Sequence, residues 1–457
     1  MDHIKSDRPY WCATKWILLF IVLFLCQLMS GALTNLSAKE YAYINISNPF
    51  LKKTPIAVTE FKLTHASEME KTDAKMAQQM LEDALNFIGY LKTMNPVAFL
   101  ANPAKTGVSL PEINFRDWTG IGAELLVTGK ITEVPAGNVT LELRLFDTFK
   151  STLLVGNIYS ASRSQIRKMI HKFCSDISFA LTGSYGVFNS KIAFVSTVNG
   201  NKEIFTCDFD GQDIKQFTFH KSISLSPSWS SDGQWLAYVS YARGGTKIFV
   251  ENFMEKIGNV IDYKGTTSSP DWMPGSLKIA ASLTFSGDPE IYLLTRQGEI
   301  IKRITNSWGI DVSPRFSPDG QKIAFTSRRH GSPQIYIQDL VSGLVRRLTF
   351  NGLNNTSPAW SPDGKKIAYV GINENRIDIY VINIDSGMPV QLTMNAGDNE
   401  DPCWSPDGSM IAFSSTREGG VQRIFVMNVS GTDQRQLFKS SGRQTQPDWS
   451  LPLDTKN

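Results

Sequence analysis

The sequence predicts a small α/β domain followed by a six-bladed β-propeller. A repeat of about 44 residues fills the C-terminal three-fifths of the 457-residue chain, and the region before it carries two amphipathic helical patterns instead. An apolar stretch near the first residue is typical of a secretory signal. We expect five segments, which are a signal peptide (1–32), an arm (33–55), the α/β domain (56–183), the propeller (184–450) and a tail (451–457).

The first segment has the three parts of a signal peptide. Lys5, Arg8 and Lys15 are positive, residues 16–29 are apolar, and residues 30–32 (SGA) are small enough for a cleavage site. The alternative is an uncleaved membrane anchor, but the apolar core is shorter than the ~20 residues of a spanning helix. We therefore expect a secreted, cleaved protein.

The α/β domain is predicted from periodicity. In residues 71–91, apolar side chains at Met76, Met80, Ala84 and Ile88 recur every four residues, with Leu81 and Leu85 beside them, which indicates an amphipathic helix. A second helix is expected over 164–181, where a stripe ends at Leu181 before Gly183. The stripe consists of Ile166, Ile170, Phe173, Cys174, Ile177 and Leu181. Strands are expected over 56–61, 123–132 and 139–147.

The propeller is predicted from its repeat. The motif PSWSSDG at 227–233 returns as PRFSPDG, PAWSPDG and PCWSPDG, with a degenerate copy at 270–275 and a truncated one at 447–450. Its prolines are 43, 44, 44, 44 and 45 residues apart. An apolar strand such as KIAFT follows each turn, and a second such as QIYI comes about ten residues later. Four short strands in ~40–45 residues are the period of a WD40-like propeller blade.

The number of blades follows from counting two kinds of strand. The Ile-Ala strand occurs six times, the first time at 191–195, and the Pro-x-Trp/Phe strand also occurs six times, the last time at 447–450. The first Ile-Ala strand has no Pro-x-Trp strand before it, and the last Pro-x-Trp strand has no Ile-Ala strand after it. We therefore expect the C-terminal strand to complete the first blade and close the ring, which removes exposed sheet edges.

Composition and motifs argue against several classes of function. A net charge of +3 with no run of five like charges does not suggest a nucleic-acid surface. Three cysteines lie beyond the signal, and neither their spacing nor that of the histidines suits a disulfide framework or a metal site. The Asp-Gly turns do not match a calcium-binding loop, so we expect no metal and no cofactor. His171 could be catalytic, but a structural role is favoured.

The repeat and the front domain together resemble the TolB family. The repeat PxWSPDGxxIAF is shared with the propellers of some serine peptidases, whereas the front domain is more specific. Residues 56–61 (IAVTEF), 118–129 ending in LLVTG, and 143–147 (LRLFD) are similar to the family pattern, as are the junction 171–183 and the ending PDWSLP. The resemblance covers residues 43–453 and departs from the pattern at 273–275, at 92–113 and in the arm.

The resemblance implies a periplasmic binding protein of the Tol–Pal cell-envelope system. Its propeller would bind the peptidoglycan-associated lipoprotein Pal, and its arm would bind TolA, to maintain outer-membrane integrity and constriction at division. We expect a monomer, peripheral to the envelope membranes, that does not bind nucleic acid. The arm residues assigned to this role are Tyr41, Tyr43, Ile44 and Ile46.

A partner-binding site is expected where the loops before the Pro-x-Trp strands rim one mouth of the central channel. Polar side chains dominate these loops, and propellers carry their functions in such loops. The alternative is that these side chains only form solvated turns. The candidate residues are Thr266, Thr267, Asp311, Asn354, Asn355, Asn399, Glu400, Arg443 and Gln444.

The two rival functions are a peptidase and a propeller that binds another ligand. A peptidase would need a Gly-x-Ser-x-Gly elbow, which the sequence lacks, so we expect no enzyme. A secreted propeller that binds another ligand or a carbohydrate stays open, since only the resemblance of the front domain argues against it.

Overall fold

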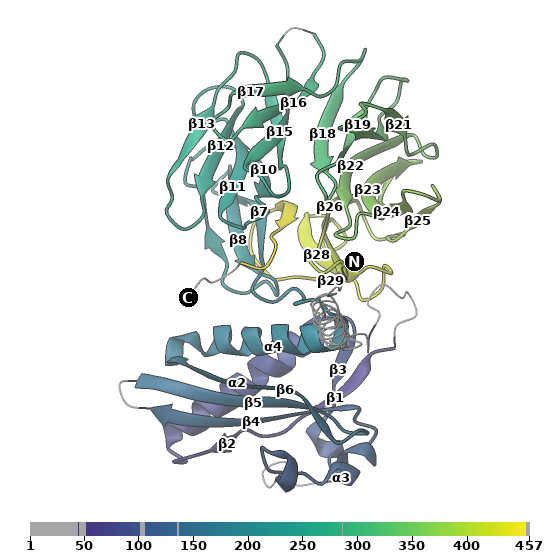
Figure 1. Ribbon diagram of the computed structural model, residues 1–457. Helices are drawn as coiled ribbons and strands as arrows, with labels where there is room; N and C mark the ends of the chain where they lie inside the picture. Colours follow the sequence, from purple (N-terminus) through teal and green to yellow (C-terminus); the bar gives the residue numbers. More distant parts are fainter. Residues whose placement is uncertain (1–43, 45–51, 101–105, 135–136, 286, 454–457) are drawn as a thin grey trace, which may run out of the picture. The chain divides into compact units, whose positions relative to one another are not determined.

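The computed structural model describes residue 44 and residues 52–100, 106–134, 137–285 and 287–453 (Figure 1). The expected signal peptide and most of the expected arm lie outside these residues, as do residues 454–457 of the tail. Within the described part, no helix is both long enough and apolar enough to cross a bilayer.

In the described residues, the α/β domain combines one sheet with three α-helices. Its sheet has the strand order β3-β1-β4-β5-β6, with β2 beside β4, and β4 to β6 form an antiparallel meander. The elements are β1 (Thr54–Val58), β2 (Lys62–Leu63), α2 (Glu68–Phe87), β3 (Leu91–Thr93), η1 (Pro96–Ala98), η2 (Leu110–Glu112), α3 (Phe115–Thr119), β4 (Leu125–Val134), β5 (Asn138–Asp147), β6 (Thr152–Ser162), η4 (Arg163–Gln165) and α4 (Ile166–Thr182).

Both faces of this sheet are covered, because successive side chains of a strand point to opposite faces. Leu125 and Val127 pack with α2 and α4 in one core, whereas Leu126 packs in a smaller core around Trp118 of α3. This second layer was not predicted, because residues 92–121 carry no period that identifies it.

The first predicted helix begins and ends a few residues earlier than expected. α2 begins after Ser67, whose Oγ accepts a hydrogen bond from the Glu70 amide at 3.0 Å, and ends at Phe87, so Leu91 belongs to β3. The buried face carries Ala77, Leu81, Ala84 and Leu85, whereas Met76 is 37% exposed. The expectation was wrong for Met76, which lies on the exposed side of the helix. It is confirmed for the rest of the predicted stripe, since Met80, Leu81, Ala84, Leu85 and Ile88 pack in the core.

This correction gives a stability prediction. We expect Leu81→Ala to lower the free energy of unfolding by about 2–5 kcal/mol, because it leaves a cavity in a fully buried site. Met76→Ala, on the partly exposed side of the same helix, should cost less than about 1 kcal/mol. Urea unfolding of both variants measures the difference, and equal losses would contradict the observed orientation of α2.

The second predicted helix is confirmed. All six residues of the expected stripe are buried in α4. Gly183 ends the helix with a φ of 78° and donates its amide to the Phe179 carbonyl at 2.9 Å, which is a left-handed C-terminal cap that favours glycine.

The propeller consists of six four-stranded sheets (Figure 1). In each blade the strand nearest the ring axis is the one that carries the Pro-x-Trp/Phe motif. The strands are β7 (Lys191–Val198), β8 (Asn201–Asp208), β9 (Lys215–Gln216), β10 (Ser224–Trp229), β11 (Trp235–Ser240), β12 (Lys247–Asn252), β13 (Gly258–Ile261), β14 (Thr267–Trp272), β15 (Lys278–Leu283), β16 (Glu290–Thr295), β17 (Ile300–Arg303), β18 (Asp311–Phe316), β19 (Lys322–Ser327), β20 (Gln334–Asp339), β21 (Val345–Arg347), β22 (Asn354–Trp360), β23 (Lys366–Asn373), β24 (Arg376–Asn383), β25 (Pro389–Gln391), β26 (Asn399–Trp404), β27 (Met410–Ser415), β28 (Arg423–Asn428), β29 (Arg435–Gln436) and β30 (Gln444–Trp449).

The motif tryptophans pack between neighbouring blades. Trp272, Trp360 and Trp404 each donate Nε1–H to a backbone carbonyl of the preceding inner strand at 3.0 Å. Each also lies in a hydrophobic cluster shared by two blades. Each of these indole rings is therefore in apolar contact on its faces and hydrogen-bonded at its edge, which suits a buried tryptophan.

The ring is closed by the C-terminal strand, which confirms the prediction. β30 pairs with β7 in the sheet order β30-β7-β8-β9, with Trp449 opposite Ile192. Trp449 also donates Nε1–H to Ser190 Oγ at 2.8 Å. The first blade therefore contains strands from both ends of the repeat region.

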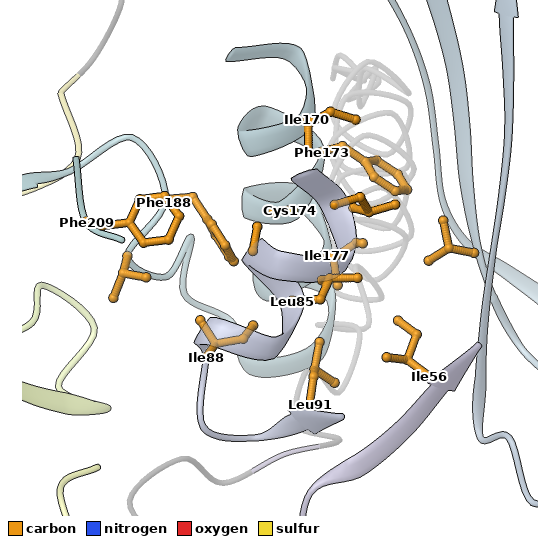
Figure 2. Packing of buried hydrophobic residues seen from close by; sticks show 14 of the residues in the cluster. Ile56, Leu85, Ile88, Leu91, Ile170, Phe173, Cys174, Ile177, Phe188 and Phe209 are labelled. Carbon is orange, nitrogen blue, oxygen red and sulfur yellow. The ribbon is translucent and has the colours of Figure 1, made fainter. Parts of the chain in front are cut away.

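The core between the last and the first blade continues into the α/β domain. Figure 2 shows Phe188 and Phe209 close to Cys174 of α4 and to Ile88, which follows α2. Polar contacts border this core. Arg167 of α4 donates to Asp210 at 2.7 and 2.8 Å, and Arg435 donates to the Phe87 carbonyl at 2.7 Å.

Candidate partner-binding surface

The candidate surface lies at one end of the blades, which we call the mouth face. It comprises the loops that lead from each outer strand into the next inner strand and the loops between the two middle strands. The register places them together, since Ser224, Ser240 and Lys247 follow one another across the second blade. The α/β domain contacts the opposite ends, for example at Asp210 after β8. The mouth face is therefore left free by that domain.

Five of the nine predicted mouth residues have buried side chains. They stand at the start of the inner strand, where each is at most 2% exposed, and they are Thr267, Asp311, Asn355, Asn399 and Gln444. Asn399 is typical, because its Nδ2 donates to the Gly397 carbonyl at 2.9 Å and its Oδ1 accepts from Ser415 and Arg417 at 2.8 Å. These side chains hold the loops in place, so their contribution to partner binding is indirect.

The other four predicted residues reach the surface. Thr266 and Arg443 are exposed, and Asn354 and Glu400 are half-buried. Burial and the nearby Asp401 raise the pKa of Glu400. Gln422 donates to Glu400 and accepts from Arg443, so these three side chains form a connected polar group. That these four residues bind a partner stays a prediction.

The buried side chain of Asn399 has a measurable structural role. We expect Asn399→Ala to lower the free energy of unfolding by about 1–3 kcal/mol, because buried partners such as Ser415 lose their hydrogen bonds. Thr266→Ala, whose side chain is exposed, should stay within about 0.5 kcal/mol of the parent. Thermal unfolding of the two variants makes the comparison, and an unchanged Asn399→Ala protein would refute the role.

The mouth face also carries large apolar side chains that were not predicted. Phe219, Phe350 and Met394 are 70%, 70% and 61% exposed, and each follows a buried threonine of the outer-strand end. We call these three residues, together with the exposed Trp308 and Leu353, the apolar rim. Exposed apolar side chains gathered on one face are typical of protein-binding sites, and aromatic residues often dominate binding energy.

The repeat explains why the rim faces outward. In the sequences FTF, LTF and LTM, the middle threonine turns inward and its Oγ1 accepts a hydrogen bond from a strand amide, at 2.8 Å in Thr218 and 2.9 Å in Thr349 and Thr393. The following residue must then point to solvent, since neighbouring side chains of an extended segment alternate.

A charged bridge crosses the ring axis between the inner strands. Arg315 Nη1 lies 2.9 Å from Asp271 Oδ1 on the neighbouring blade and 3.3 Å from Asp448 Oδ1 on β30, the inner strand of the opposite blade. The second oxygens of these carboxylates accept the amides of Phe316 and Trp229, both at 2.8 Å. Burial raises the pKa of Asp448 to about 6, although Arg315 acts in the other direction.

Of the predicted arm residues, the structure describes Ile44 alone. Its side chain is buried in the core of the α/β domain, and its amide donates to the Leu181 carbonyl at 3.2 Å. Tyr41, Tyr43 and Ile46 lie outside the described residues, so their role stays a prediction.

The remaining candidates have structural surroundings. His171 is buried with its ring 5.0 Å from that of Phe209, and burial lowers its pKa to about 4. Cys174, Cys207 and Cys403 are buried thiols whose pKa values burial raises. In the part of the chain that the structure covers, no three His, Cys, Asp or Glu side chains are grouped as metal ligands would be.

The fold defines a β-propeller protein with an α/β domain at one end of the blades and a free loop face at the other. Comparison with known proteins gives the family. Residues 179–453 match the TolB β-propeller domain family and residues 42–154 match the TolB amino-terminal domain family. The chain therefore belongs to the TolB family.

Individual relatives agree with this assignment. The Tol–Pal system protein TolB of Desulfosudis oleivorans is 60% identical over 90% of this chain and 94% of that protein. A TolB homolog of Chlorobium chlorochromatii is 38% identical over 64% of each chain. The crystal structure of TolB from Acinetobacter baumannii has a TM-score of 0.77 at 28% identity, covering 88% of this chain and 97% of that one.

Proposed function

We propose that this protein is the TolB component of a Tol–Pal system and acts in the periplasm by binding other proteins rather than by catalysis. The observation that carries the proposal is the 60% identity to a Tol–Pal system protein over nearly the full length of both chains. The propeller binds the lipoprotein Pal, the arm binds TolA, and together they support outer-membrane integrity and constriction at division.

The mouth face is the proposed Pal-binding surface. It is free of the α/β domain, it presents the apolar rim, and it carries the polar group around Glu400 beside that rim. An apolar anchor bordered by polar residues is the usual anatomy of a protein–protein interface. The rim residues supply contact area, and the rigid closed ring keeps the entropic cost of binding low.

The test is calorimetric titration of the protein with the periplasmic domain of Pal from the same organism. A rim variant, Phe219→Ser/Phe350→Ser/Met394→Ser, should weaken binding at least tenfold. The matched control is Met254→Ser/Val341→Ser/Met388→Ser, which removes exposed apolar side chains from turns at the opposite ends of the blades. The control should bind like the parent.

The outcomes separate three conclusions. If both variants bind Pal like the parent, Pal is a partner but the rim is not its site. If the parent does not bind Pal, the proposed function fails and a ligand-binding propeller becomes the leading alternative. A chain lacking residues 33–43 should lose TolA binding and keep Pal binding, and retained TolA binding would remove the arm from the proposal.

A further inference from the structure

The outer edge of the α/β sheet is formed by β6. This strand pairs with β5 on one side and ends the strand order on the other. Among the described residues, no backbone hydrogen bond reaches its second side. The register shifts between Leu153 and Val155, and the regular part from Val155 to Ser162 therefore presents a row of N–H and C=O groups along about 26 Å, at ~3.3 Å per residue.

This edge differs from the other outer edges that the structure describes. The opposite edge of the same sheet is β3, three residues long with an exposed Lys92. The outer strands of the six blades have two to four residues, and most contain lysine, arginine or proline. Short, charged or proline-bearing edges prevent unwanted pairing. Residues 151–162 (STLLVGNIYSAS) contain neither a charge nor a proline.

The strand is held rigid from the inside. Asp176 of α4 accepts hydrogen bonds from Tyr159 Oη at 2.6 Å and from Asn157 Nδ2 at 2.7 Å, so one face of β6 is fastened to the helix. On the other face Ile158 is 69% exposed, beside the Glu142 and Arg144 ion pair of β5. A preformed strand pairs with little loss of conformational entropy.

We propose that the free edge of β6 binds an extended segment of a partner protein, which joins the sheet as an additional strand. The backbone N–H and C=O groups along the edge of β6 provide the affinity, as in other cases of strand addition. The segment carries uncharged side chains along the edge and an apolar residue against Ile158. This site lies in the α/β domain, so it is separate from the mouth face and does not depend on the proposed binding of Pal.

The contact area favours a partner segment over a second copy of this chain. Two single edges that meet side by side bury much less than the ~1,200–2,000 Å² of a stable protein interface. A smaller buried area is sufficient for the transient binding of a peptide segment. Self-pairing is therefore the outcome that the experiment must separate from the proposal.

The experiment measures hydrogen–deuterium exchange in residues 150–163 of the full chain, with and without a synthetic peptide. The peptide alternates threonine and valine over seven residues between a terminal lysine and a terminal glutamate. The control peptide has proline at its two central threonines, which removes donors and disfavours a strand. The first peptide should slow exchange at about half of the β6 amides at least tenfold, and the second should not.

A matched pair of variants places the contact. Ile158→Lys should raise the dissociation constant of the peptide at least tenfold, because a lysine on the edge opposes pairing. Ile300→Lys, which changes an exposed isoleucine on β17, should leave the constant unchanged. If Ile158→Lys does not fold, Ser160→Lys replaces it, since that side chain is exposed on the same strand.

Three results would overturn the proposal. The first is unchanged exchange in β6 at saturating peptide, and the second is equal affinity in the Ile158→Lys variant and the parent. The third is slow exchange in β6 without peptide that becomes slower as the protein concentration rises, which would assign the edge to a second copy of the chain.

Discussion

A chain that ends at Arg443 should fail to form the closed propeller. The truncation removes β30, and with it the pairing to β7, the buried Trp449 and both contacts of Asp448. The inner strand of the first blade is then missing, and β7 becomes an unpaired edge facing the ring axis. Native proteins are stable by only about 5–15 kcal/mol. The loss of one of four strands in a blade should therefore remove most of the free energy of unfolding.

The measurements are near-ultraviolet circular dichroism and thermal unfolding, followed by size-exclusion chromatography. We expect the truncated chain to lose the tryptophan signal of a packed ring and to aggregate through the exposed edge. A chain shortened only by residues 454–457 is the matched control and should unfold like the parent. If the long truncation melted within a few degrees of the parent, the ring would not depend on its C-terminal strand.

The repeat made the propeller predictable because nearly every copy carries its own turn residues and its own tryptophan or phenylalanine. Ser361 Oγ donates to Asp363 at 2.5 Å, and Gly364 follows with a φ of 69°, so the SPDG sequence specifies the turn locally. Closure of the ring could be deduced by counting strands. The second layer of the α/β domain could not, because Trp118 is buried by tertiary packing against strands that the local sequence does not identify.

The candidate surface was predictable in position but not in its residues. The sequence located the loops, and the register confirms that they share one end of the blades. Polar residues such as Asn355 and Asn399 were expected at the surface, yet their side chains are buried and their Nδ2 groups donate to loop carbonyls. Side-chain direction at a strand start depends on which groups need partners, and composition alone does not contain that information.

The charged bridge across the ring axis is a contact that could not be predicted from the sequence. Arg315 and Asp448 are 133 residues apart and meet only because the ring brings opposite inner strands together. Nothing in the local motif distinguishes Arg315 from Ala359, which occupies the same repeat position.

The second large effect is expected for Arg315→Met. The substitution keeps much of the side-chain volume but leaves the half-buried carboxylates of Asp271 and Asp448 without their cation. A polar group that is left without its partner costs about 1–3 kcal/mol, which suits a site where the Arg315 side chain itself is partly exposed. We therefore expect a loss of this size in the free energy of unfolding at pH 7.5, measured by urea denaturation. Arg328→Met, which changes an exposed arginine on a loop, is the control and should have little effect.

The loss should shrink as the pH falls, and the sign follows from the direction of the pKa shift. Burial raises the pKa of Asp448 in the folded protein from 3.8 to about 6, so between these values the folded state binds more protons than the unfolded state. Ionisation of this carboxyl therefore opposes folding at neutral pH, and the cost is relieved below pH 6. Without Arg315, the pKa of Asp448 in the folded protein rises further. Protonation on acidification then begins at a higher pH and restores more of the free energy of unfolding.

The comparison between variant and parent isolates this group. His171, whose pKa burial lowers to about 4, destabilises both proteins equally on acidification, because protonation then favours the unfolded chain. Its contribution cancels in the difference. A deficit of Arg315→Met that stayed constant from pH 7.5 to pH 5 would mean that Asp448 and Asp271 are not the groups left uncompensated. Adding Asp448→Asn to Arg315→Met should recover part of the loss at pH 7.5, since it removes one of the two buried charges.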